Sequence, residues 1–386
     1  MVGDEKPKKK KHRLIRITGS ILSLAVLTYI AVMLITGRGV DITWFLDLFS
    51  SGEPAVMASE YNFDVGRDRV FADLGGSLAA AGSLGVQVLD IEGDETLRDP
   101  FRMSNPAIKA MKGRAIAFDI GGTAISVFNN SQVIASIETD NIIISASINR
   151  NGWFCVCTQG SRGYKGFATV YNSKGNEKYC VSLSSGYILS AALSPDNSSL
   201  AVLNLTDDCS RITFYNDLSN ESADSTFDLP GNLVLDIWYT DDSNLVAISR
   251  QALITVNKDG LGSELFNFSG KRLGAYTYDD SFYALHLYDY GIGFRGQLIT
   301  LDIEGNIIGE VSTDQELISM SSGGGNLAVL STNGFNIYSS KLEVYPPSVE
   351  RASISGATRI LPLESGAALA VGEHLAVTLQ RARPEG

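Results

Sequence analysis

Histidine, the side chain most often used for proton transfer and metal binding near neutral pH, is scarce in this chain. The 386 residues include only His12, His286 and His374. This scarcity excludes a histidine-rich metal site and leaves two candidates, His286 and His374, for the base of a catalytic triad. His286 stands between Leu285 and Leu287 in an apolar run, which favours a structural histidine over a base.

Cysteine is almost as rare, with Cys155, Cys157, Cys180 and Cys209 as its four occurrences. No two of them have the C-x-x-C spacing of a zinc site, so we expect no metal. Cys155 and Cys157 alternate on one expected strand and point to the same face, which places them poorly for bonding each other. The even count permits disulfides outside the cell, but buried free thiols are the favoured state.

Negative charge outweighs positive charge over most of the chain. The net charge is −12, yet residues 1–38 hold eight Lys and Arg against two acids, a net charge of +6. Residues 39–386 therefore hold 23 bases and 41 acids, a net charge of −18. An acidic body lacks the basic stripe that binds phosphates, which argues against a nucleic-acid partner.

An uncharged apolar segment, residues 17–37, follows the basic tail. As a helix it would span roughly 31 Å, which matches a bilayer core of about 30 Å. Seven of the eight bases precede it, so the N-terminus is expected in the cytoplasm and the body outside the cell. A cleavable signal peptide would have a shorter apolar core and an A-x-A site, and the exit from Ile35 to Gly39 lacks that site.

We therefore expect a cytoplasmic tail at 1–13, an uncleaved transmembrane signal-anchor helix at 14–37 and a juxtamembrane linker at 38–58 in a cell-membrane protein. Four apolar residues in the linker are typical of a membrane-interface belt, or alternatively of a short helix packed on the body. They are Trp44, Phe45, Leu48 and Phe49.

The body, residues 59–386, is a repeat of short strands without helical periodicity. Small and β-branched apolar runs recur eight times with a mean step of about 41 residues, the period of a β-propeller blade. The runs begin at Leu78, Ala115, Trp153, Leu200, Leu245, Phe282, Leu327 and Ala368. We predict an all-β, eight-bladed propeller, with seven blades as the alternative.

A polar turn that ends in glycine keeps the same period. Its glycines can take the positive φ of a hairpin turn, and the Asp or Asn before them can hydrogen-bond the turn backbone. They are Gly93, Gly175, Gly260 and Gly305, which we place between the third and fourth strands of their blades.

The last repeat has three expected strands, at 360–363, 368–371 and 375–379. An extra strand, Glu60 to Val65, precedes the first repeat. A propeller must close to remove its exposed edges, so we expect the extra strand to complete the last blade. The alternative is a linker strand packed on the rim.

The turn from Leu193 to Ala201 contains Ser194-Pro195-Asp196, with Asn197 where glycine is usual. It resembles the S-P-D-G-x-x-L-A turn of WD40-like and TolB-like propeller repeats. The whole layout of basic tail, anchor and repeat body resembles an uncharacterised family, a domain of unknown function, of single-pass membrane-anchored propellers from Gram-positive bacteria. The resemblance implies an extracytoplasmic propeller and brings no established activity, cofactor or catalytic residue.

Three connections between second and third strands look long, and two of them share a Gly-aromatic-basic-Gly element, Gly163–Gly166 and Gly293–Gly296. An exposed aromatic ring beside a cation could stack on a sugar, a peptide aromatic or a planar ligand. Alternatively the glycines shape the hairpins and the rings cover a neighbouring blade. The third connection is 204–210. The candidate ligand-binding residues are Arg162, Tyr164, Lys165, Tyr290, Phe294 and Arg295.

These observations favour a non-enzymatic binding or scaffold module for a protein or cell-envelope polymer. An extracytoplasmic enzyme is the alternative. A glycan hydrolase would need two carboxylates ~5–10 Å apart, whereas the acidic pairs 207–208, 241–242 and 279–280 have the character of turns. A quinone-cofactor enzyme would show periodic tryptophans, and Trp44, Trp153 and Trp238 have no such period. A subunit of an envelope assembly, contacted through the transmembrane helix, is a third option.

Overall fold

The computed structural model describes residues 56–219, 222–240, 243–291, 293–350, 356–362, 368–373 and 375–380. The expected tail at 1–13, the expected transmembrane helix at 14–37 and nearly all of the expected linker lie outside this part of the chain. Within the described residues, no helix has the length and apolar character needed to cross a bilayer.

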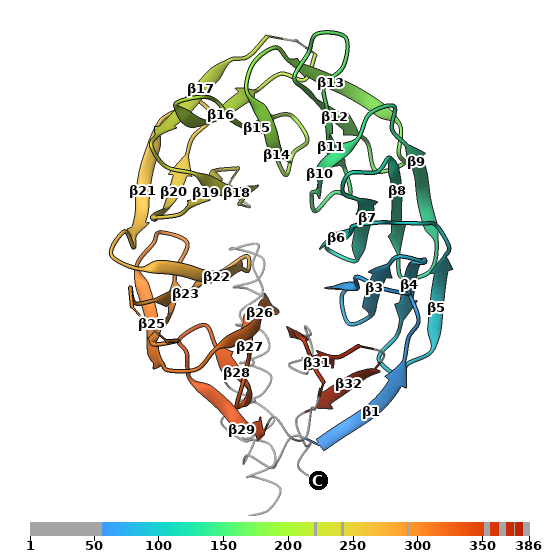
Figure 1. The fold of residues 1–386 in the computed structure, drawn as a ribbon, viewed down its shortest axis with the longest axis vertical. Coiled ribbons are helices and arrows are strands. Elements are labelled where there is room, and N and C mark those ends of the chain that lie inside the picture. The colour runs from blue at the N-terminus through green and yellow to red at the C-terminus, as the bar shows by residue number, and fades with distance from the viewer. Residues whose placement is uncertain are drawn as a thin grey trace, which may run out of the picture. The chain divides into compact units, whose positions relative to one another are not determined.

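The described residues form eight antiparallel sheets of four strands each, arranged in a ring (Figure 1). In each sheet, or blade, we letter the strands a to d from the inside of the ring outwards, as β14 to β17 show in Figure 1. Seven blades use four consecutive strands, and the eighth uses three plus the first strand of the described residues. The predicted eight-bladed propeller is thus confirmed over the seven-bladed alternative.

Strand bounds follow the expected period. Blades 1 to 4 contain β2 (Val70–Asp73), β3 (Leu78–Gly82), β4 (Gly85–Leu89), β5 (Glu95–Asp99); β6 (Pro106–Met111), β7 (Arg114–Asp119), β8 (Ala124–Asn129), β9 (Val133–Glu138); β10 (Ile143–Ile148), β11 (Phe154–Gln159), β12 (Gly166–Tyr171), β13 (Glu177–Leu183); and β14 (Tyr187–Leu193), β15 (Leu200–Leu205), β16 (Cys209–Tyr215), β17 (Ser225–Pro230).

Blades 5 to 8 contain β18 (Val234–Tyr239), β19 (Leu245–Ser249), β20 (Ala252–Val256), β21 (Gly262–Asn267); β22 (Arg272–Tyr278), β23 (Tyr283–Tyr288), β24 (Gly296–Leu301), β25 (Ile307–Thr313); β26 (Leu317–Gly323), β27 (Asn326–Ser331), β28 (Gly334–Ser339), β29 (Val344–Glu350); and β30 (Arg359–Pro362), β31 (Ala368–Val371), β32 (Leu375–Gln380) with β1 (Val56–Asn62).

Blade 8 closes the ring as predicted, because β1 pairs antiparallel with β32. The pairing runs from Val56 opposite Gln380 to Asn62 opposite Leu375. The strand lies earlier than the expected range of 60–65 because Phe63 and Val65 leave the sheet. Both side chains are buried instead in the hydrophobic core between blades 8 and 1.

The eight recurring apolar runs lie on or overlap the b strands, which are buried against the neighbouring blades on both faces. In β15, for example, Leu200, Ala201, Val202 and Leu203 are all fully buried. Small residues in these strands let adjacent sheets pack closely, so the run recurs because each blade presents the same buried layer.

The four glycine turns connect strands c and d, as predicted, and have positive φ angles of 77° to 91°. In each turn one side-chain Oδ1 atom accepts hydrogen bonds from two backbone N–H groups. The four acceptors are Asp90, Asn172, Asn257 and Asp302. The same chemistry therefore ends the outer hairpin of blades 1, 3, 5 and 6.

None of the four cysteines, all of which the structure describes, forms a disulfide. Cys155 and Cys157 are buried in the core between blades 3 and 4, and the hydrogen bond with Cys157, together with burial, raises the pKa of Cys155. Both behave as small apolar residues of a b strand.

Candidate functional site

The alternating strand directions divide the connections between two faces of the ring. The b–c and d–a connections lie on one face, which we call the loop face, and the a–b and c–d turns lie on the other, which we call the turn face. Residues that are distant in the sequence meet on the loop face whenever their blades are neighbours.

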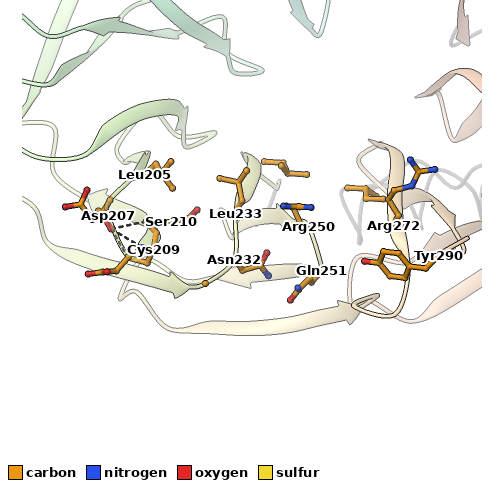
Figure 2. A pocket seen from close by; sticks show the side chains of 15 residues that line it. Leu205, Asp207, Cys209, Ser210, Asn232, Leu233, Arg250, Gln251, Arg272 and Tyr290 are labelled. Atoms are coloured by element: carbon orange, nitrogen blue, oxygen red, sulfur yellow. Dashed lines mark hydrogen bonds between the residues drawn. The ribbon is translucent and has the colours of Figure 1, made fainter.

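A pocket of about 760 Å³ lies on the loop face over blades 4, 5 and 6 (Figure 2). Its volume falls within the range of about 300–1,000 Å³ typical of ligand sites. The charged and aromatic side chains that line it come from four connections, and they are Asp207, Asp208, Arg250, Arg272 and Tyr290.

Arg250 and Gln251 reach the pocket because Ser249 shapes the two-residue connection between β19 and β20. The buried Ser249 Oγ accepts hydrogen bonds from the backbone N–H groups of Gln251 (3.2 Å) and Ala252 (2.9 Å). Asn232, which lies in the connection between β17 and β18, also donates to Ser249 Oγ at 3.1 Å. The tight turn leaves the side chains of Arg250 and Gln251 exposed at its tip.

Arg272 enters the pocket from the first residue of β22. Its guanidinium carbon lies 4.9 Å from the centre of the Tyr288 ring, a cation–π contact. The Tyr288 hydroxyl accepts a hydrogen bond from the backbone N–H of Leu317 at 3.2 Å, which fixes the ring. Within the described residues, neither Arg272 nor Arg250 forms an ion pair with a carboxylate, so both guanidinium groups are available to a ligand.

Asp207 and Asp208 form the opposite end of the pocket, in the connection between β15 and β16. Thr206 and Cys209 close this connection, since Thr206 Oγ1 donates to the Cys209 carbonyl at 3.0 Å and accepts from the Cys209 N–H at 3.1 Å. The loop is shorter than the expected 204–210, because both strands extend into that range. Neither carboxylate has an ion pair among the described residues.

The six predicted ligand-binding residues lie in two exposed loops that the structure does not bring together. Arg162, Tyr164 and Lys165 lie in blade 3, whereas Tyr290, Phe294 and Arg295 lie in blade 6, with blades 4 and 5 between them. Tyr290, which is 71% exposed, is the one of the six that lines the pocket.

The two loops do share a local geometry. Gly163 and Gly293 both have positive φ angles, 94° and 106°. Each loop aromatic lies near a second ring, Tyr164 at 5.7 Å from Phe167 and Phe294 at 6.3 Å from Tyr288. Tyr164 and Phe294 remain 47% and 43% exposed, and ligand binding by these loops stays a prediction.

Sequence reasoning missed Arg250 and Arg272. Each stands in a short connection without an unusual motif. The available signal was positional. Once the strands are numbered, Arg250 lies in the b–c connection of blade 5 and Arg272 follows the connection from blade 5 to blade 6, both at the loop face.

Towards the turn face lies a much smaller cavity, about 120 Å³, which is lined mainly by the a strands of blades 2 to 6 and by a–b turns of blades 3 to 6. Asp280 lies beside it and is 2.8 Å from Lys112 Nζ and 3.4 Å from Arg150. Asp236, on β18, is 3.9 Å from Lys109 Nζ. Both carboxylates are thus paired with cations from other blades.

The acidic pairs have different outcomes. Asp279 and Asp280 form part of the a–b turn of blade 6 as predicted, although the ion pairs of Asp280 were not expected. The pair at 241–242 lies outside the described residues. Within the described part of the chain, no group of three or more His, Cys, Asp or Glu residues could hold a metal ion.

His286 is buried as expected of a structural histidine, but only one of its ring nitrogens has a partner. Nε2 lies 3.0 Å from Thr313 Oγ1, whereas Nδ1 has no hydrogen-bond partner among the residues that the structure describes. Burial lowers the pKa of His286 to about 4, so the ring is neutral at physiological pH. His286 is therefore a buried structural residue, with one ring nitrogen unpaired among the described residues.

Residues 53–343 match the model of a family of unknown function, DUF5711. The chain belongs to this family. This agrees with the resemblance to an uncharacterised family, while its expected membrane anchor and Gram-positive origin stay predictions. No curated protein matches the sequence.

Solved structures with the same fold share little sequence with this chain. The C-terminal WD40 domain of Sif2 is 10% identical with a TM-score of 0.54, covering 86% of this chain and 97% of that one. Sqt1 from Saccharomyces cerevisiae is 10% identical with a TM-score of 0.59, covering 86% and 100%. BamB from Moraxella catarrhalis is 14% identical with a TM-score of 0.51, also covering 86% and 100%. These likenesses confirm the WD40-like fold.

Proposed function

We propose that this protein is a non-enzymatic binding or scaffold module, tethered to the membrane by residues 14–37 and facing out of the cell. It holds a protein or an envelope polymer on its loop face. The observation that carries the proposal is the pocket over blades 4 to 6, where charged side chains of both signs have no ion-pair partner within the described chain. Exposed charges in a concave site are available to a complementary partner.

The position of β1 supports a tether that leaves the pocket accessible. Val56, the first residue of β1, pairs with Gln380 at the end of β32. Because β32 is the c strand of blade 8, this end of the pairing lies on the turn face. The chain thus joins the ring on the face opposite the pocket, and a membrane anchor preceding β1 is compatible with a loop face directed outwards.

Photo-crosslinking of the full chain in the membranes of cells that make it tests the proposal. A photoreactive residue at Gln251, in the pocket, should give a defined adduct. The matched control is the same residue at Lys174, an exposed position on the turn face, which should give none.

Two results would count against the proposal. Equal adducts at both positions would show non-specific contact, and no adduct at Gln251 would remove the pocket as a docking site. Turnover of a glycan panel by the purified chain, without an adduct, would replace the binding function with an enzymatic one.

A further inference from the structure

The pocket over blades 4 to 6 separates its charges by sign. Asp207 and Asp208 come from blade 4, whereas Arg250 comes from blade 5 and Arg272 from blade 6. Figure 2 shows Asp207 towards one end of the pocket and Arg272 towards the other, with Arg250 between them. The pocket therefore has an acidic end and a basic end.

The basic end is preorganised to bind a carboxylate. The cation–π contact with Tyr288, 4.9 Å from the guanidinium carbon to the ring centre, holds the Arg272 head group in the pocket without using a carboxylate. A planar guanidinium matches a carboxylate with two parallel hydrogen bonds. Because the Tyr288 ring is itself fixed by Leu317, little side-chain freedom remains to be lost on binding.

The balance of charges distinguishes between classes of partner. The four charged side chains sum to zero, so a polyanionic envelope polymer would be attracted at one end and repelled at the other. A neutral glycan would leave all four charges without a counter-charge. A polypeptide can carry both signs within a few residues, and Tyr290 adds an exposed ring for an apolar side chain.

We infer that the pocket takes an extended peptide segment of a protein partner, with an acidic group at Arg250 and Arg272 and a basic group at Asp207 and Asp208. This inference rests on the proposed function and narrows its ligand to a peptide with both charges.

A library of twelve-residue peptides displayed on phage, selected on the purified full chain, tests the inference. Selected peptides should carry an acidic and a basic residue at a recurring separation. Their affinity should fall about tenfold or more for the pair Arg250→Glu with Arg272→Glu, and similarly for Asp207→Lys with Asp208→Lys. Lys174→Glu with Lys258→Glu, a matched charge change on the turn face, should leave the affinity unchanged.

The inference is overturned if no peptide is enriched, if the peptides carry charge of one sign only, or if neither pocket variant weakens binding. Thermal unfolding of each variant checks that the ring remains folded. The Gln251 crosslink distinguishes failure of this inference from failure of the proposed function. If the adduct forms but the selected peptides do not carry both charges, the proposed function stands and the inference fails.

Discussion

Asp280 in blade 6 lies 2.8 Å from Lys112 Nζ in blade 2, although 168 residues separate them in the sequence. In an eight-bladed ring these blades are four apart in either direction, so the contact joins opposite sides of the propeller at the turn face. Arg150 of blade 3 adds a second cation at 3.4 Å. These side chains thereby bridge the ring at its turn face.

This bridge should contribute modestly to stability. Both side chains of the Lys112–Asp280 pair are about half exposed, and double-mutant cycles on such pairs typically give about 0.2–1 kcal/mol. A double-mutant cycle with Lys112→Ala and Asp280→Ala, measured by chemical denaturation, should give a coupling of that size at low salt. It should shrink as salt screens the charges. A coupling of zero at low salt would show that the contact is not formed in solution.

The stability of the ring should fall as the pH is lowered from about 6.5 to 4, in part because of His286. Its pKa is lowered to about 4 in the folded protein from 6.5, so the unfolded chain binds the additional proton in this window. Each pKa unit corresponds to about 1.4 kcal/mol, which gives a loss of roughly 3 kcal/mol.

His286→Gln removes this titration and isolates its effect. The difference in unfolding free energy between the wild type and the variant should shift against the wild type as the pH falls, because the carboxylates common to both proteins cancel. A difference that stays constant from pH 7 to 4 would contradict the burial of a neutral ring.

Gly260→Ala should destabilise the protein more than Gly113→Ala does. Both glycines have positive φ angles, 77° and 74°, where a side chain costs about 1–2 kcal/mol. A Cβ atom at Gly260 would also lie 2.5 Å from the Thr226 carbonyl oxygen of the neighbouring blade, whereas at Gly113 it meets nothing within 4 Å. Overpacking adds about 1–3 kcal/mol. Equal losses of melting temperature in the two variants would mean that blades 4 and 5 move apart easily at Gly260.

Tyr290→Ala should weaken crosslinking from Gln251 and leave the melting temperature nearly unchanged, because the tyrosine ring is 71% exposed and lines the pocket.

Tyr164→Ala and Phe294→Ala should also weaken capture of the partner without unfolding the propeller. If these two changes lower the melting temperature sharply and leave capture intact, their loops serve the hairpins alone.

The sequence predicts the fold well because a propeller repeats one physical solution. Each b strand must be apolar on both faces, and glycine keeps recurring at c–d turns such as Gly260, so the period is visible without an alignment. The bounds of β1 were displaced because a period-2 pattern does not reveal where Phe63 stops pairing and begins to fill the space between blades 8 and 1.

The candidate site is harder to predict because it depends on which side chains lack partners. Arg211 and Arg250 cannot be told apart by residue type, yet Arg211 is held by Asp228 at 2.6 Å and Arg250 has no such partner among the described residues. The predicted loops at Tyr164 and Phe294 share a motif and both lie on the loop face, but blades 4 and 5 separate them.

The pairing of β1 with β32 delays completion of the ring until residues 375–380 have been made. A nascent chain that has not yet released residues 375–380 has no partner for β1, and both edges of the unfinished ring can pair with other chains. These unpaired edges should therefore be most open to aggregation or to chaperone binding just before β32 is made.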